Sequence, residues 1–379
     1  MKVLNVSYTL DNITGGGVAE RSFQLSKFLS LHGENCHLLT LDTGGATSRK
    51  DFLGKTKLVV LPCLIKRFYL PKISWAKLNS LVADADIIHL IGHWSFLNML
   101  VYLIIRRHKK PYAVCPAGAL RIFGRSKFIK LIYNFVIGKS IIKNASLHIA
   151  ITEDEIKQFA PYGVTKKIYV IPNGIDAKDF QSAEVSEFKN KYNLNGKSFI
   201  LFLGRLNLIK GPDLLLQAFC NIKDKFPLYD LVFVGPDGGL LAELKKKAQE
   251  FSASNRVHFL GHLGGADKSN AYHAADLLVI PSRQEAMSIV ALEAGICGTP
   301  VLLTDQCGFD ELAIVGAGWV TPATAQGIQT GLASILSDSN ERLVAASKIK
   351  EFVAQNFTWE LIVKKSILLF SEAIKAFHR

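Results

Sequence analysis

The chain has 379 residues, of which 49% are hydrophobic and 20% are charged, and its formal net charge is +13. This composition is typical of globular proteins and excludes a disordered or fibrous chain. Because the length exceeds the size at which single hydrophobic cores stop growing, we expect two domains.

The cysteines and the apolar runs indicate where the protein works. The six cysteines are scattered and form no Cys-x-x-Cys pair, so we expect reduced thiols and no zinc site. The first residues, MKVLNVSYTL, lack the pattern of a signal peptide, and the longest apolar run, Met99 to Ile105, falls far short of the roughly 20 residues that span a bilayer. We expect a cytoplasmic protein, peripherally associated with the inner face of the membrane.

The positive charge is concentrated in the first half. Residues 1–175 carry 24 Lys and Arg against 10 Asp and Glu, whereas residues 176–379 carry 21 against 22. From Ile87 to Thr152 there are ten basic residues and no acidic residue. A field of one sign favours an anionic partner, such as a membrane surface or a lipid-linked diphosphate.

The first predicted strand, KVLNVSYTL, leads into a glycine-rich turn. Gly15, Gly16 and Gly17 open the helix that follows this strand. Glycines at a strand-to-helix turn let the backbone approach a phosphate or a sugar closely, although the same residues also suit an ordinary tight turn.

Polar residues stand at both ends of the strand IIHLI. Asp84-Ala85-Asp86 precedes the strand, away from the carboxyl edge where ligands bind, so we interpret it as a solvated turn and not as a metal site. His93 and Trp94 follow the strand on the ligand side, and we consider them as acceptor contacts. His89, within the strand, suits packing in the core at least as well.

Residues 121–144, RIFGRSKFIKLIYNFVIGKSIIKN, combine helical apolar spacing with positive charge. A basic amphipathic helix can lie on an anionic membrane, but its apolar stripe can also pack on a sheet with the basic face in water. The two interpretations are compatible, because packing uses the stripe and membrane attraction needs only the charge. The stripe consists of Phe128, Ile129, Ile132, Tyr133, Val136 and Ile137, and the interleaved basic residues are Arg125, Lys127, Lys130 and Lys139.

A second set of alternating strands and helices begins after the turn signal Asn173-Gly174. The alternation predicts two doubly wound α/β domains, residues 1–175 and 176–356, with their carboxyl edges facing each other across a cleft. Residues 357–379 are amphipathic, and we expect a helix that packs back on the first domain.

Two carboxylates and two cations stand at predicted strand ends of the second domain. Glu285 falls on the loop between the strand LLVIP and a helix that Ser288 could cap, and Glu293 lies inside that helix. Arg205 and Lys210 lie on the loop after the strand SFILFL. Two cations at a carboxyl edge can clamp a diphosphate and neutralise the charge that grows on it as a glycosidic bond breaks.

The second half resembles the nucleotide-binding domain of the retaining GT-B glycosyltransferases of the group-1 family, also called family 4. The first half resembles the family more weakly, through GGGVAERSFQLSKFL, DIIHLIGHWS and VIPNGID. The blocks in the second half are GRLNLIKGPDLLLQAF, LVFVGPDGG, VHFLGHL, AADLLVIPS and EAMSIVALEAGICGTPVLLTD.

This resemblance implies a role for each candidate residue. Arg205 and Lys210 would hold the diphosphate, Glu285 would contact the donor sugar, and Glu293 would accept hydrogen bonds from the ribose hydroxyls. No metal or other cofactor is expected, because the two cations and a helix N-terminus replace it. The further donor contacts that the resemblance implies are Gly16, Gly17, His262, Leu263, Met287, Ser288 and Ile289.

Two positions depart from the family pattern. Where relatives often carry Gly-Phe-Gly after the first glutamate, this chain has Ala286-Met287-Ser288, which leaves the choice of sugar open. Many relatives have a histidine or an arginine where this chain has Ala117, so a catalytic histidine cannot be transferred to that position.

The expected activity is that of a metal-independent retaining glycosyltransferase. It would transfer a hexose from a nucleotide sugar, UDP-glucose by family frequency, to a lipid-linked or membrane-associated glycan in exopolysaccharide or lipopolysaccharide biosynthesis. The alternatives are a nucleotide-sugar 2-epimerase of the same fold, a silent sugar-binding or scaffold protein, and a basic nucleic-acid-binding protein. The last is disfavoured because no aromatic-interleaved binding motif occurs and the second half is neutral.

Overall fold

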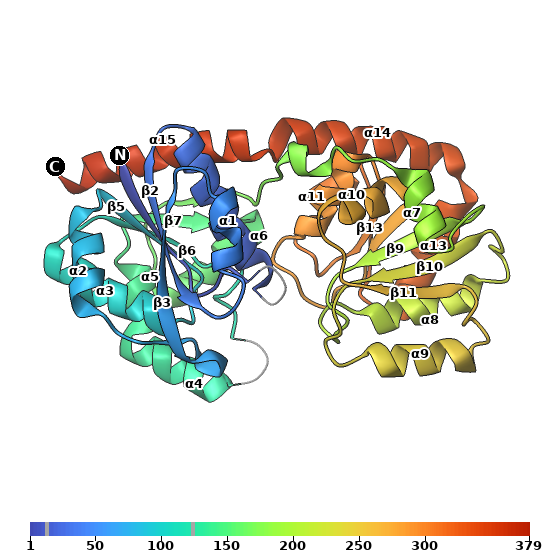
Figure 1. The fold of residues 1–379 in the computed structure, drawn as a ribbon, viewed down its shortest axis with the longest axis horizontal. Helices are drawn as coiled ribbons and strands as arrows, with labels where there is room; N and C mark the ends of the chain where they lie inside the picture. The colour runs from blue at the N-terminus through green and yellow to red at the C-terminus, as the bar shows by residue number, and fades with distance from the viewer. Residues whose placement is uncertain (12–14, 123–125) are drawn as a thin grey trace. The chain divides into compact units, whose positions relative to one another are not determined.

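The structure is a computed structural model that describes residues 1–11, 15–122 and 126–379, so that Arg125 lies outside the described residues. The chain divides into two compact units (Figure 1). Unit 1 comprises Met1–Asn173 with Trp359–Arg379, and unit 2 comprises Gly174–Thr358. The domain limits expected from the sequence, after residues 175 and 356, lie two residues from these divisions.

Unit 1 contains an eight-stranded sheet in the order β4-β3-β2-β1-β5-β6-β7-β8, which is parallel apart from the antiparallel edge strand β4. The order reverses between the central strands β1 and β5, and helices cover both faces of the sheet (Figure 1). The strands are β1 (Lys2–Val6), β2 (Asn35–Asp42), β3 (Lys57–Ile65), β4 (Leu70–Pro71), β5 (Ile87–Ile91), β6 (Tyr112–Cys115), β7 (Leu147–Ala150) and β8 (Ile168–Val170).

The helices of unit 1 include one from the far end of the chain. Helix α15 (Trp359–Phe377) packs on α1 (Gly16–Leu31), with the rings of Trp359 and Phe28 stacked 6.4 Å apart. The other helices are α2 (Trp75–Asp84), α3 (Phe96–His108), α4 (Lys127–Tyr133), α5 (Lys139–Lys143) and α6 (Glu153–Ile156). Short 3-10 turns η1 (Thr47–Phe52), η2 (Lys66–Phe68) and η4 (Lys157–Tyr162), and the π-helical turn η3 (Asn134–Gly138), complete the unit.

Unit 2 is built on a six-stranded parallel sheet in the order β11-β10-β9-β12-β13-β14. All-apolar strands such as Leu277–Ile280 are buried on both faces, as a parallel sheet between helices requires. Its strands are β9 (Ser198–Leu203), β10 (Tyr229–Val234), β11 (Val257–Gly261), β12 (Leu277–Ile280), β13 (Val301–Thr304) and β14 (Trp319–Thr321). Its helices are α7 (Val185–Lys191), α8 (Pro212–Ile222), α9 (Leu241–Glu250), α10 (Gly265–Ala274), α11 (Ile289–Cys297), α12 (Glu311–Ile314), α13 (Ala325–Ser337) and α14 (Ser339–Asn356), with the 3-10 turn η5 (Ala177–Phe180).

The predicted pair of doubly wound α/β domains is therefore confirmed, with a main core cluster in each unit and a smaller one, which includes Leu10, Phe23 and Leu38, in unit 1. Among the described residues, no helix is long and apolar enough to cross a bilayer.

The amphipathic stretch differs from the expectation that its apolar stripe packs on the sheet. Only Tyr133 and Ile137 of the predicted stripe pack against the core, whereas Phe128, Ile129, Ile132 and Val136 are exposed. The reason is rotation of the helix, because the side chains that turn inward are Tyr133, Asn134 and Ile137, and Asn134 binds His93 and Tyr162.

Candidate active site

The loops that carry the predicted site residues of unit 2 meet where its strand order reverses. Strands β9 and β12 are hydrogen-bonded neighbours, although two further strands separate them in the sequence. In open α/β sheets, ligands bind outside the carboxyl ends of the strands at such a reversal. The β9–α8 loop, residues 204–211, and the β12–α11 loop, residues 281–288, both leave this edge.

Close backbone contact and an ion pair join the two loops. Gly211 has φ +67°, and a Cβ there would lie 2.0 Å from the carbonyl oxygen of Pro281, so only glycine fits this crossing. Arg283 donates its backbone N–H to Ile209 O (2.8 Å) and binds Asp213 through both guanidinium nitrogens (2.8 and 2.6 Å). No sequence pattern singles out Arg283 or Asp213, because seventy residues separate them.

Within this pair of loops, the structure brings two of the predicted site residues together. Lys210 Nζ donates to Glu285 Oε1 at 2.8 Å, and Ser282 Oγ donates to Glu285 Oε2 at 3.1 Å. The side chain of Lys210 is 33% exposed and that of Glu285 is 12% exposed, so the pair is accessible from one side. A cation and a carboxylate that accepts hydrogen bonds thus stand side by side at the reversal point.

Helix α11 begins immediately after this pair. Ser288 stands at its N-cap, as predicted, but its side chain makes no capping bond, and its buried Oγ has no partner within the described part of the chain. The first amides of the helix are therefore open to an anionic ligand. Gly308, at φ +60°, lets the loop after β13 support Ala286, because a Cβ there would lie 2.2 Å from Ala286 O.

Glu293 lies one turn and a half into α11 and is 6% exposed. Its two oxygens accept hydrogen bonds from Lys268 Nζ and from Tyr272 Oη, both at 2.6 Å. Burial and the adjacent carboxylate raise the pKa of Tyr272 well above its ordinary value, so the phenol stays a donor. Helix α10, which supplies both partners, thereby orients the carboxylate. Each carboxylate oxygen can accept a second hydrogen bond, so this arrangement leaves capacity for a ligand hydroxyl.

The other predicted donor contacts of unit 2 surround the same edge. Arg205 is partly buried, and its side chain packs against Gly238 in the loop after β10. His262 is exposed and Leu263 is buried in the loop between β11 and α10, while Met287 and Ile289 flank the N-cap of α11. A pocket of about 340 Å³ adjoins these loops and is lined by Leu206, Phe233, Gly235, Pro236, Asp237, Leu241, Lys245, Phe259, Leu260 and Gly261.

The remaining candidates belong to unit 1. Gly16 and Gly17 begin α1, and Gly16 has φ +59°. His93 is only 1% exposed, and its Nε2 shares a 2.9 Å hydrogen bond with Asn134, which argues against a direct contact with an acceptor. Burial lowers the pKa of His93 to about 4, so the ring is neutral. Trp94 is partly exposed and donates its indole N–H to Ala119 O.

The loop CPAGAL has an unusual backbone held by a buried carboxylate. Ala117 has φ +53° and Gly118 has φ +81°, a conformation that is rare for alanine. Glu155 accepts the backbone N–H groups of Gly118 and of Ile151, and its burial raises the pKa of its carboxyl. Glu155, which no sequence pattern singles out, therefore fixes the backbone of this loop.

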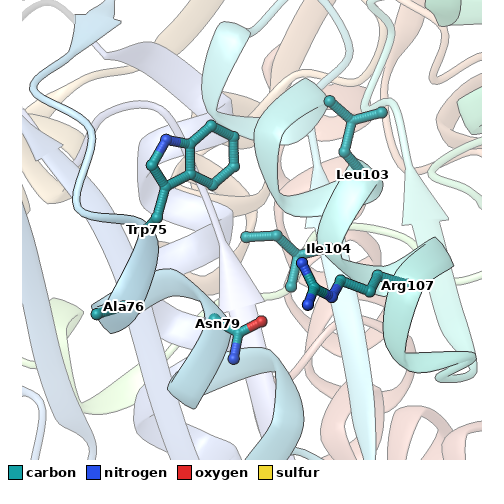
Figure 2. Close-up of a pocket in the computed structure, with 6 residues that line it drawn as sticks. All are labelled: Trp75, Ala76, Asn79, Leu103, Ile104 and Arg107. Carbon is teal, nitrogen blue, oxygen red and sulfur yellow. The ribbon is translucent and has the colours of Figure 1, made fainter.

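Two other features of unit 1 lie apart from the candidate site. Asp84 and Asp86 are both exposed, and Asp84 accepts from Lys2 Nζ and Asp86 from the Lys2 backbone N–H, both at 2.7 Å. No cluster of three His, Cys, Asp or Glu that could hold a metal occurs in the described ranges. Figure 2 shows a pocket of about 480 Å³ between α2 and α3. It is lined by Trp75, Ala76, Asn79, Leu103, Ile104 and Arg107, none of them a predicted site residue.

The two doubly wound sheets define the GT-B class, and solved structures show the same fold. HepE of Anabaena, solved with UDP and glucose, superposes with a TM-score of 0.81 at 19% identity, covering 98% of this chain and 99% of that one. Sucrose-phosphate synthase of Thermosynechococcus elongatus gives 0.79 at 21% identity, covering 99% and 100%. WaaG, a glycosyltransferase of lipopolysaccharide biosynthesis, gives 0.70 at 18% identity, covering 97% and 99%.

Sequence comparison identifies the family. Residues 184–352 match the model of the glycosyl transferases group 1, and residues 15–179 match that of glycosyltransferase family 4. The chain belongs to the group-1, family 4 glycosyltransferases. A D-inositol 3-phosphate glycosyltransferase of Actinosynnema mirum is 29% identical over 64% of this chain, and an uncharacterized glycosyltransferase of Methanocaldococcus jannaschii is 30% identical over 56%. The matches span 61% and 56% of those two relatives.

Proposed function

We propose that the protein is a metal-independent retaining hexosyltransferase that uses UDP-glucose as donor and a lipid-linked or membrane-associated glycan as acceptor. The observation that carries the proposal is the Lys210–Glu285 pair, held at the strand reversal beside the open N-terminus of α11. A nucleotide sugar presents an anionic diphosphate next to a hydroxyl-rich sugar. This edge offers a cation and helix amides that suit the diphosphate, and carboxylates that suit the hydroxyls.

In the proposed reaction, the bond between the sugar C1 and the diphosphate oxygen breaks, and the acceptor oxygen forms a new bond to C1 on the same face. The electron pair of the broken bond remains on the diphosphate, where Lys210, Arg205 and the amides at Met287, Ser288 and Ile289 stabilise the growing charge. The acceptor hydroxyl gives its proton to the departing phosphate oxygen. No protein histidine is required, which suits Ala117 in the loop fixed by Glu155.

The other donor contacts are proposed from the resemblance to the family. Glu293, oriented by Lys268 and Tyr272, accepts hydrogen bonds from the ribose hydroxyls. His262 and Leu263 meet the base through their backbone, and Glu285 binds the sugar. The choice of UDP-glucose as donor is supported by HepE, whose structure contains UDP and glucose.

The acceptor and the location are proposed from charge. The whole charge excess lies in residues 1–175, and both a lipid-linked diphosphate and the inner leaflet are anionic. We place the reaction at the cytoplasmic face of the membrane, in exopolysaccharide or lipopolysaccharide assembly, with Trp94 near the acceptor.

The test is transfer of radiolabelled glucose from UDP-glucose to lipid in a membrane fraction, with EDTA in a parallel sample. We expect radiolabel to appear in the lipid fraction, in an amount that EDTA does not reduce. We also expect UDP-glucose to raise the Tm of the protein. Absence of transfer from UDP-glucose and from every other nucleotide sugar of a panel would contradict the proposal. Conversion of UDP-N-acetylglucosamine to its epimer without acceptor would identify the 2-epimerase instead, and a salt-dependent gel shift would indicate nucleic-acid binding.

A further inference from the structure

The helical run from α4 through η3 to α5 presents two different faces. Its inward face packs on the core through Ile137 and is anchored by hydrogen bonds. Tyr133 Oη donates to His93 O at 3.0 Å, and Asn134 binds both His93 and Tyr162. Its outward face is apolar and unusually bare, since Phe135 is 91% exposed and Phe128 is 73% exposed. We call this surface the outward apolar face; it consists of Phe128, Ile129, Leu131, Ile132, Phe135 and Val136.

The anchored face shows that this exposure is not a fraying end. Because Asn134 is buried and bonded on both sides of its amide, the rotation of the helix about its axis is fixed. The apolar side chains opposite it must therefore point away from unit 1. A contiguous apolar surface of this kind marks an interaction site in a soluble protein.

The charges around the outward apolar face select its partner. Lys127 and Lys139 are exposed beside it, whereas Lys130 lies over the ring of Trp94. Between Ile87 and Thr152 the sequence has no acidic residue. After this range, Asp154 is the first acidic residue that forms an ion pair. It is already paired with Arg121 and Lys157. A second copy of this surface would bring lysines against lysines, whereas an anionic leaflet attracts them and accepts apolar side chains below its headgroups.

A neighbouring hollow extends the apolar surface. A pocket of about 550 Å³ adjoins it, with Leu131 and Phe135 on one side and Ile122, Pro161 and Tyr162 on the other. Arg121 and Lys139 stand among its lining residues, so positive charge meets apolar surface here as well.

We propose that the outward apolar face inserts into the headgroup region of an anionic bilayer, with its bordering lysines on the lipid phosphates. This proposal adds a contact surface to the membrane association in the proposed function. It rests on the proposed function only for the biological role of the contact. The contact is not electrostatic alone, because Phe128 and Phe135 enter the apolar layer, and salt should therefore weaken binding without abolishing it.

The test uses the full chain without donor or acceptor, so its outcome does not depend on the proposed reaction. Binding is measured by flotation with vesicles of phosphatidylcholine alone or with about one third phosphatidylglycerol. The variant Phe128→Ser with Phe135→Ser should bind the anionic vesicles at least about tenfold more weakly than the wild type. Phe52→Ser, which alters an exposed phenylalanine elsewhere in unit 1 (68% exposed), should bind like the wild type.

Insertion itself is read by fluorescence. The emission of Phe135→Trp should shift to the blue in anionic vesicles and be quenched by brominated lipid, whereas Phe52→Trp should show neither change. Equal binding by the double serine variant and the wild type would overturn the proposal. It would also be overturned if the wild type bound no vesicles, or if it formed a dimer in the absence of lipid that the double variant dissolved, which would make the surface a subunit interface.

Discussion

Lys210 and Glu285 lie 75 residues apart in the sequence and form a 2.8 Å ion pair at the carboxyl ends of the neighbouring strands β9 and β12. The strand reversal brings their loops together, and Gly211 allows the loop of Lys210 to touch the backbone of Pro281. The pair is therefore a product of the sheet topology.

Substitution of Lys210 by alanine should lower kcat about 100-fold or more, because the leaving diphosphate loses a fixed cation. The Tm should change little, since the side chain is partly exposed. Lys246→Ala, at a lysine that is 77% exposed on α9, is the control and should leave turnover unchanged. The exchange of both charges, Lys210→Glu with Glu285→Lys, separates the roles: restored activity would show that the pair is structural only.

The Arg283–Asp213 pair should contribute to activity by holding the two loops in register. A double-mutant cycle with Arg283→Ala and Asp213→Ala should give a coupling free energy of about 1 kcal/mol, since Arg283 is partly exposed. In each variant the loss of kcat, expressed as a free energy, should exceed the loss of stability. The pair Arg121–Asp154, which is more than half exposed on both sides, is the matched control and should show almost no coupling. Additive effects of Arg283→Ala and Asp213→Ala would refute the clamp.

Removal of one phenol should reveal the orientation of Glu293. Tyr272→Phe leaves a buried carboxylate oxygen without its 2.6 Å donor, so the free energy of unfolding should fall by about 1–3 kcal/mol. KM for the nucleotide sugar should rise more than kcat falls, because the ribose contact is made in the ground state as well. Tyr192→Phe, whose hydroxyl makes a longer 3.4 Å bond to Asp267, is the control. An unchanged KM for Tyr272→Phe would separate Glu293 from donor binding.

Unit 1 should lose stability as the pH falls below about 6.5, the ordinary pKa of histidine. Burial lowers the pKa of His93 to about 4 and that of His89 to about 3, so the unfolded chain binds protons first. Between pH 7.5 and 5.5 each of these histidines should cost about 1.4 kcal/mol of unfolding free energy. His93→Gln should reduce the pH dependence measured by urea unfolding by about that amount. The same dependence in wild type and variant would mean that His93 titrates normally.

The sequence carried the fold and much of the site because their signals are local. Short all-apolar strands alternating with helical stretches determine two doubly wound sheets, since only burial between helices suits such strands. Residues that directly follow a strand must lie at the carboxyl edge, which is why Lys210 and Glu285 could be placed without a structure. Strand β14 is not evident in the sequence, because a three-residue strand such as Trp319–Thr321 leaves almost no periodic signal.

Tertiary structure alone decided which partners each side chain meets and which way each helix faces. Glu293 finds Lys268 and Tyr272, and Arg283 finds Asp213, through the packing of elements that are distant in the sequence. Apolar periodicity marks a stripe on residues 127–139 but not its rotation, and the bonds of Asn134 turn Phe128 and Phe135 outward. A pattern along the chain records the spacing of side chains, whereas contacts depend on how rigid elements dock, and docking is set by all their side chains together.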